Sequence, residues 1–244
     1  MRENKKILSI VQNFVCTSDH RKEMVFKNLP KMSKIFDEIN FYVVYNTKEN
    51  LQDIEREYSK YIKNLNFEYS DSKDWGLKTL ELVNKVQTPY VLYLCEDFDY
   101  LCDEKDWNDA LDEMLVKNKV DFVMLAKIEK YSNPQSEWIS YYNKIEDHAM
   151  YYNGLGSPSK VLSIDAIYKK DFLVERLKAY TEKYSHHLPN NYETFYKNEN
   201  GIRRFDMECA IPRKLLLYSY HPEGDREAKI EDMNANEPLG LKVK

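Results

Sequence analysis

Short apolar runs alternate with helically spaced segments along the first half of the chain, and no other sequence feature constrains the fold as strongly. The runs of strand length are 7–14, 41–45, 66–69, 90–95 and 120–126. The segments 21–36, 51–65, 77–86 and 107–116 carry apolar residues at three- and four-residue spacing, which is typical of helices. Because the links are short and the strands almost wholly apolar, this alternation predicts an α/β protein with a mostly parallel sheet and helices on both faces.

The pattern loosens after residue 126. Residues 161–167 predict a further strand, and 172–184 and 206–217 predict helices, the last despite Pro212. No repeat or linker divides the chain, so we expect a single domain over 1–222 with halves 1–106 and 107–222. Residues 223–244 are charged and weakly apolar, which predicts a C-terminal extension that is extended or wraps the surface.

Composition excludes several classes of protein. The 36 basic and 41 acidic residues give a net charge of −5, without the basic excess typical of nucleic-acid binding, so no nucleic-acid partner is expected. No apolar run reaches the roughly 18 residues of a membrane helix, and the N-terminus leads into a strand-like segment. We therefore expect a cytoplasmic chain with no transmembrane segment. The four cysteines show no zinc-ligand spacing, and disulfides are not expected.

Glycine is scarce. Only six glycines are present, and none follows the first predicted strand before Gly76. A dinucleotide fold, a P-loop or a sugar-nucleotide pyrophosphorylase needs a glycine-rich turn there, so that backbone amides can approach phosphates closely. A nucleotide bound by this chain would therefore need another partner for its diphosphate, and a metal ion is the first candidate.

An acidic segment follows the fourth predicted strand. Glu96, Asp97 and Asp99 come directly after it, and residues two apart in extended backbone project to one side, so Asp97 and Asp99 can share a divalent cation. Hard carboxylate oxygens suit Mg²⁺ or Mn²⁺. Chance alone supplies about seven acid-x-acid pairs in such a chain, so the position at the end of a buried strand carries the hypothesis. The alternative is a solvated acidic turn.

At this point the sequence resembles a known family. The alternation of elements, the pair Trp75-Gly76 opening a helix, and the stretch TPYVLYLCEDFD over 88–99 are similar to glycosyltransferases of the GT-A fold, the family 2-like members in particular. Their Asp-x-Asp motif corresponds to Asp97-Phe98-Asp99. The resemblance implies a nucleotide-diphosphate sugar donor bound by residues 1–106 with Mn²⁺ or Mg²⁺, and an acceptor bound by residues 107–222.

The resemblance also implies donor-binding residues. Besides Asp97, the positions that match are Asn13, Phe14, Thr17, Asn46 and Asp71 for the nucleoside, with Lys73, Arg21 and Lys78 as candidates for the diphosphate. The family often has an acidic residue after the second strand, where this chain has Asn46-Thr47, so the donor base stays open. The alternative for each nucleoside position is an ordinary strand-end or turn residue, and for each basic residue a surface charge.

Later motifs occur in the family's order. Residues 153–158 resemble its glycine-containing acceptor loop, Asp206 and Glu208 its acidic motif, and His221 its metal-binding histidine. Glu208 is the first candidate for the catalytic base, Asp206 the second and Glu193 a remote one. The alternative for Asp206 and Glu208 is a favourable position at a helix N-terminus. A lone histidine such as His221 is also common as a hydrogen-bonded structural residue.

The leading hypothesis is a metal-dependent, inverting glycosyltransferase that moves a sugar to a hydroxyl of a glycan or lipid-linked acceptor. Peripheral membrane contact is compatible with it, because a lipid-linked acceptor can be met at the membrane surface. Two alternatives stay open. One is a GT-A-like protein that binds nucleotide or glycan without turnover, and the other is a sugar nucleotidyltransferase, which the missing glycine-rich turn disfavours.

Overall fold

The computed structural model describes residues 2–14, 19–46, 48–70, 74–96, 98–125, 142–156, 165–183, 205–214 and 216–219. The helical elements in this part are α1 (Glu3–Ile7), α2 (Asp19–Ile35), α3 (Leu51–Tyr61), α4 (Trp75–Lys85), α5 (Glu104–Leu111), the π-helix η1 (Asp112–Lys117), the 3₁₀ turn η4 (Gly154–Gly156) and α6 (Lys170–Lys183). The strands are β1 (Leu8–Phe14), β2 (Asn40–Tyr45), β3 (Leu65–Tyr69), β4 (Tyr90–Leu94), β5 (Phe98–Tyr100), β6 (Phe122–Met124), β7 (Lys144–Ile145), β8 (Ala149–Asn153), β9 (Ala166–Lys169), β10 (Glu208–Pro212) and β11 (Leu217–Ser219).

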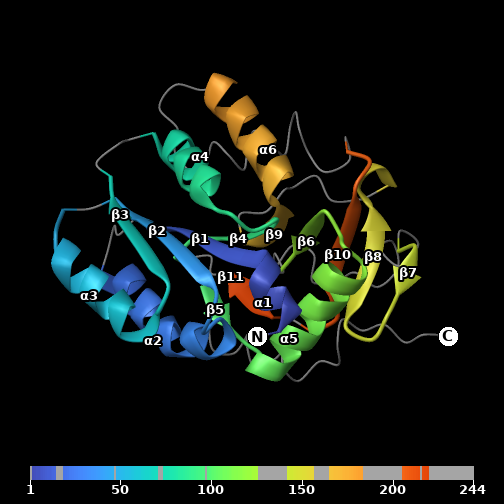
Figure 1. Ribbon diagram of the computed structural model, residues 1–244, viewed down its shortest axis with the longest axis horizontal. Coiled ribbons are helices and arrows are strands. Elements are labelled where there is room, and N and C mark those ends of the chain that lie inside the picture. Colours follow the sequence, from blue (N-terminus) through green and yellow to red (C-terminus); the bar gives the residue numbers. More distant parts are fainter. Residues whose placement is uncertain are drawn as a thin grey trace.

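Nine of these strands form one sheet in the order β3-β2-β1-β4-β9-β6-β10-β8-β7 (Figure 1). The pairs β3/β2, β2/β1, β1/β4 and β6/β10 are parallel. Strand β9 runs antiparallel to both of its neighbours, β4 and β6, and β8 is antiparallel to β10 and β7. A separate ribbon of β5 and β11 lies beside the sheet. The predicted mostly parallel α/β sheet is confirmed, and it takes strands from both halves of the chain.

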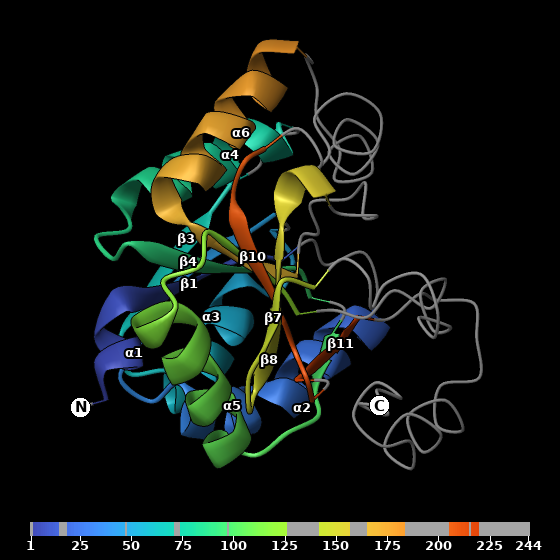
Figure 2. The same cartoon turned by 90° about the vertical axis from the view of Figure 1, so that its right-hand side faces the viewer.

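Alternate residues of the central strands enter two hydrophobic clusters, one on each face of the sheet. In β1, Ile10 belongs to the cluster that includes α2, α3 and α5, and Val11 to the cluster that includes α4 and α6. Figures 1 and 2 show α4 and α6 together on one side of the sheet and the other long helices on the opposite side. This explains the apolar runs in the sequence, since both faces of each central strand are covered.

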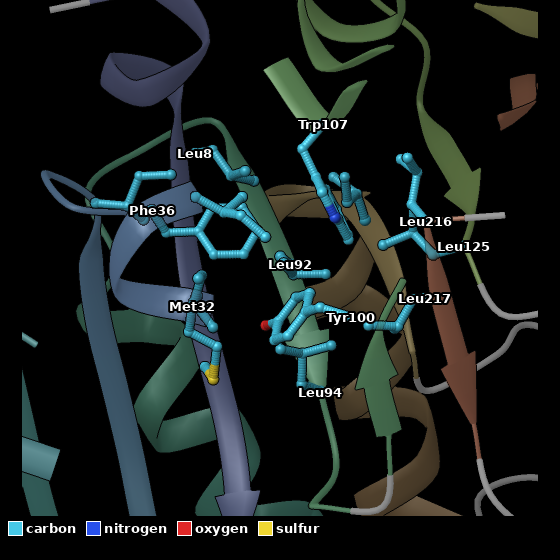
Figure 3. Packing of buried hydrophobic residues seen from close by; sticks show 14 of the residues in the cluster. Leu8, Met32, Phe36, Leu92, Leu94, Tyr100, Trp107, Leu125, Leu216 and Leu217 are labelled. Carbon is cyan, nitrogen blue, oxygen red and sulfur yellow. The ribbon is translucent and has the colours of Figure 1, made fainter. Parts of the chain in front are cut away.

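Aromatic side chains fill the first cluster beneath the ribbon of β5 and β11. The Tyr100 ring lies 5.6 Å from Trp107 and 5.8 Å from Phe36, both in edge-to-face geometry. Figure 3 shows the Tyr100 ring beside Leu92 of β4 and Leu217 of β11, with Phe36 and Trp107 on different sides of it. The segment that follows β4 is therefore anchored in the core through Phe98 and Tyr100, which leaves Asp99 between them on the other side of the ribbon.

The predicted helix over 206–217 is wrong. Glu208–Pro212 forms β10, which lies between β6 and β8, and Leu217–Ser219 forms β11. Cys209 and Ala210 are fully buried there, so sheet burial on both sides outweighs the helical spacing of the apolar residues. The strand expected at 161–167 is β9, and its described residues begin later, at Ala166.

The remaining expectations concern membranes, cysteines and the tail. Within the described ranges, no helix has the length and apolar character needed to cross a membrane. Among the described cysteines, Cys95, Cys102 and Cys209 form no disulfide bond. Burial raises the pKa of the Cys102 thiol to about 11, with Asp106 adding to the effect. The extension 223–244 lies outside the described residues.

Candidate functional site

Buried polar side chains gather where β1 and β4 end. Gln12 is fully buried, and Glu96, Asp99 and Asp165 are between 3% and 6% exposed. Asp165 directly precedes β9, whose register places Ala166 opposite Tyr93 of β4, so Asp165 also lies at the carboxyl end of β4. This edge of a parallel sheet is where ligands of such folds bind, because strands end and loops begin there.

Side chains hold the backbone of Cys95 from two neighbouring strands. The Gln12 amide donates a 3.0 Å hydrogen bond to the Cys95 carbonyl, and the Cys95 N–H donates to Asp165 Oδ1 at 3.1 Å. The Tyr58 hydroxyl donates to Gln12 Oε1 at 2.8 Å. Burial, with a smaller contribution from Glu96, raises the pKa of Tyr58 well above its usual range, so the phenol stays protonated and keeps its donor role. The chain therefore leaves β4 in a fixed direction.

Helix α2 supplies partners for the acidic segment that follows. Arg21 forms an ion pair with Glu96, and Lys27 Nζ lies 3.6 Å from Asp99 Oδ2. The amide of Asn28, which is fully buried, donates to the Phe98 carbonyl, and Lys31 Nζ donates to the Tyr100 carbonyl at 3.1 Å. The repulsion between the described carboxylates is thus relieved in part by cations on α2.

The described nucleoside candidates are divided between the interior and the sheet edge. Asn13 is 1% exposed and its amide donates to Thr79 and to the Tyr93 hydroxyl, while its Oδ1 has no hydrogen-bond partner among the described residues. The Phe14 ring is fully buried, 5.2 Å from Tyr45, so only its backbone faces the edge, where its carbonyl accepts from the Asn46 N–H at 3.2 Å. Asn46 is half-buried after β2.

Five of the predicted donor- and metal-binding residues lie outside the described ranges: Thr17, Asp71, Lys73, Asp97 and His221. Asp99 is therefore the one predicted metal ligand whose surroundings are described, and its carboxylate oxygens fit a hard divalent cation. Within the ranges that the structure covers, no three histidine, cysteine, aspartate or glutamate side chains form a group that could hold a metal. The predicted metal site stays a prediction.

Asp206 and Glu208 lie at the opposite ends of the parallel strands, where β4 and β6 begin. The register aligns Cys209 with Phe122 of β6, Phe122 with Tyr168 of β9, and Tyr168 with Val91 of β4. Glu208 is therefore level with the first residue of β4. That position is four residues, or about 13 Å along the strand, before the carboxyl end of β4.

Polar contacts of the two acids also belong to that amino edge. The Glu208 N–H donates to Asp121 Oδ2 at 2.9 Å, and Asp206 Oδ1 accepts from the Asn153 amide at 2.7 Å. The structure does not bring either acid near Asp99. Their role as catalytic base stays a prediction, as does that of Glu193, which lies outside the described residues.

Sequence reasoning missed the residues that position the acidic segment. Lys27, Asn28 and Lys31 read as ordinary helix residues, and Asp165 as a loop residue before a strand. Of the diphosphate candidates, Arg21 is paired with Glu96, and Lys78 Nζ with Glu81 at 2.6 Å. Lys27, Asn28 and Lys31 lie on one face of α2, but this spacing by itself does not indicate which segment the face contacts.

Comparison with solved structures shows which proteins share the fold of this chain. No protein-family model and no curated protein matches the sequence. The structure is similar to S. aureus TarS 1–349 in complex with UDP-GlcNAc, with a TM-score of 0.60 and 16% identity, covering 94% of this chain and 61% of that one. It is also similar to the mannosyltransferase PcManGT from Pyrobaculum calidifontis in complex with GDP-Man and Mn²⁺, with a TM-score of 0.61 and 11% identity, covering 91% and 59%. The chain thus spans about three fifths of either structure, and the likeness concerns the fold.

Proposed function

We propose, from the premise that this chain has the GT-A fold of these two proteins, that it is a glycosyltransferase using a nucleotide-diphosphate sugar. One observation carries the proposal: the acidic segment after β4 is held at the carboxyl edge of the sheet by α2, Gln12 and Asp165. A carboxylate fixed where parallel strands end is suited to holding a cation. A cation held there could in turn bind the diphosphate of a donor. TarS with UDP-GlcNAc and PcManGT with GDP-Man are examples of the donor class.

The proposed donor site combines backbone and side chains from the ends of β1, β2 and β3. Asn13, Phe14, Thr17, Asn46 and Asp71 are the proposed nucleoside residues, with Lys73 and Asp97 toward the diphosphate. Phe14 would contribute its backbone, because its ring is in the core. The amide of Asn46 offers both a donor and an acceptor to a base, so it selects no single base by itself.

Asp97 and Asp99 are the proposed ligands of a divalent cation, with His221 as a third. Mn²⁺ is present in the PcManGT complex, and carboxylate oxygens suit both Mn²⁺ and Mg²⁺. When bound, such an ion takes up negative charge on the leaving diphosphate. The protein's own contribution is positional, because Asn28 and Lys31 hold the backbone on both sides of Asp99.

The acceptor is proposed to be a hydroxyl of a glycan or a lipid-linked sugar, bound by residues 107–222. A GT-A-like protein that binds a nucleotide without turnover is the second candidate. It is favoured by the separation of Asp206 and Glu208 from Asp99, since the register of the described strands places neither of these two acids beside the acidic segment.

The first test is a thermal-shift panel of UDP, GDP, dTDP and CMP, with and without Mn²⁺, on wild type and Asp97→Ala/Asp99→Ala. One nucleotide should stabilise wild type only with Mn²⁺, by about 2.7 kcal/mol at 100 times its dissociation constant. The double variant should lose that shift. A control removing two exposed acids elsewhere, Glu3→Ala/Glu55→Ala, should keep it. No shift with any nucleotide would refute donor binding.

The second test concerns turnover and the base. Sugar transfer and donor hydrolysis are measured for Asp206→Asn, Glu208→Gln and Glu193→Gln, each with nucleotide binding as a control for folding. If Glu208 or Asp206 is the base, its variant should lose turnover by at least about a hundredfold and still bind nucleotide. The register leads us to expect that both of these variants retain activity. If wild type binds a nucleotide but turns over no donor, the second candidate, a binding protein without turnover, is supported instead.

A further inference from the structure

Lys27 and Asp99 form an ion pair with unequal surroundings. Lys27 Nζ lies 3.6 Å from Asp99 Oδ2, and the Lys27 side chain is 67% exposed while that of Asp99 is 8% exposed. Asp99 is fixed, because the carbonyls of both neighbours, Phe98 and Tyr100, accept hydrogen bonds from α2. The Lys27 ammonium is carried on a flexible four-carbon chain that is exposed to solvent, so Lys27 is the partner that can move.

A divalent cation on Asp99 and the ammonium of Lys27 exclude each other at this distance. Oxygen ligands lie roughly 2.0–2.6 Å from such an ion, so the ion would take the place beside Asp99 that the ammonium now occupies. Two positive centres within a few ångströms repel strongly, and the cation has the higher charge. Binding of the cation must therefore displace Lys27 toward solvent.

We infer that Lys27 is a counter-ion that exchanges with the metal. It neutralises Asp99 when the cation is absent, and on release it binds a phosphate oxygen of the donor at the same site. This inference rests on the proposed function, because it takes Asp99 as a metal ligand. It assigns one residue two effects of opposite sign: Lys27 weakens binding of the metal alone and strengthens binding of the nucleotide diphosphate to the metal-loaded protein.

The chain offers a matched control on the same helix. Lys34 lies two turns after Lys27 on α2, carries the same charge and is exposed. Lys27→Met and Lys34→Met both remove one positive charge from α2 and keep an unbranched side chain. Their difference isolates the contact with Asp99 from the general field of the helix.

The first measurement is calorimetric titration with MnCl₂ alone at low salt. Lys27→Met should bind Mn²⁺ about three- to tenfold more tightly than wild type, and the gain should shrink at 0.5 M salt because the competing charge is partly exposed. Lys34→Met should stay within about twofold of wild type. Equal gains in the two variants, or weaker binding by Lys27→Met, would overturn the inference.

The second measurement titrates UDP and GDP into the same proteins at saturating Mn²⁺. For the nucleotide that wild type binds, Lys27→Met should bind about three- to tenfold more weakly, and Lys34→Met should be close to wild type. Unchanged or tighter binding by Lys27→Met would overturn the exchange. Failure of wild type to bind Mn²⁺, together with no shift for any nucleotide of the thermal-shift panel, would instead remove the proposed function, so the two failures are distinguishable.

Discussion

Gly76 occupies a place where two helices meet without room for a side chain. A Cβ added there would lie 2.7 Å from Cε1 and 2.8 Å from Cδ1 of Tyr180, a fully buried ring of α6. Real Cβ atoms do not approach other atoms so closely. Gly76, which contributed to the sequence resemblance, therefore has a packing reason in this molecule, the contact between α4 and α6.

At this residue, Gly76→Ala should lower the free energy of unfolding by about 1–3 kcal/mol, because the Tyr180 ring or one helix must shift. Chemical denaturation measures the change. Leu77→Ala, an exposed neighbour on the same helix, should stay within about 0.5 kcal/mol of wild type. In a double-mutant cycle, Gly76→Ala should cost less in a Tyr180→Ala background. Additive costs would show that Tyr180 is not the obstacle.

Among the elements, the hairpin of β7 and β8 is tied to η1 through Glu146. Its carboxylate pairs with Lys144, accepts from the Asn118 amide at 2.9 Å and lies 3.1 Å from Lys117 Nζ. The hydrogen bonds from Lys144 and Asn118 lower the pKa of Glu146 from 4.5 to about 2. A carboxyl with a lowered pKa in the folded state stabilises the fold at neutral pH. That contribution is lost as the pH falls through the folded-state value.

Glu146→Gln should therefore have a lower melting temperature than wild type at pH 7, and the gap should close between about pH 4.5 and pH 2. Circular-dichroism melts at pH 7, 4 and 2.5 would follow it. Glu55→Gln, an exposed glutamate on α3, should show little gap at neutral pH. A gap for Glu146→Gln that is the same at every pH would mean that the carboxylate charge is not what ties the hairpin.

The sequence predicted some elements well and others not at all, for physical reasons. Strands β1, β2 and β4 are covered on both faces, so their apolar runs are distinctive. The short run in β10 fits a helix as well as a strand, and only pairing with β6 and β8 decides between them. The acidic segment was visible, but its partners Lys27 and Asn28 are distant in the sequence and meet it only in the folded chain.

On the scale of the whole molecule, one sheet separates two hydrophobic clusters. The strands of the two predicted halves meet in its centre, where β4 of the first half pairs with β9 of the second. Because both clusters pack on the same strands, loss of packing on one face of the sheet also destabilises the packing on the other face. We therefore expect the halves 1–106 and 107–222 to unfold together as one unit.

Leu29→Ala, in the first cluster and the first half, and Leu173→Ala, in the second cluster and the second half, test this expectation. Both side chains are buried, so each variant should lose about 2–5 kcal/mol. Tryptophan fluorescence and far-ultraviolet circular dichroism should report a single, coincident denaturant transition for wild type and for both variants. Two separated transitions in either variant would show that the clusters belong to separately folding units.

The position of β9 bears on how the protein is made. A ribosome delivers β1 to β4 early, yet the strand that covers the open edge of β4 is not complete until residue 169 has emerged. Nascent chains thus carry an unpaired apolar edge in the middle of the future sheet, which is where strands of neighbouring molecules join in aggregation. In this protein, neighbouring strands of the sheet are not made one after the other. The edge of β4 is therefore the place where shielding of the nascent chain would matter.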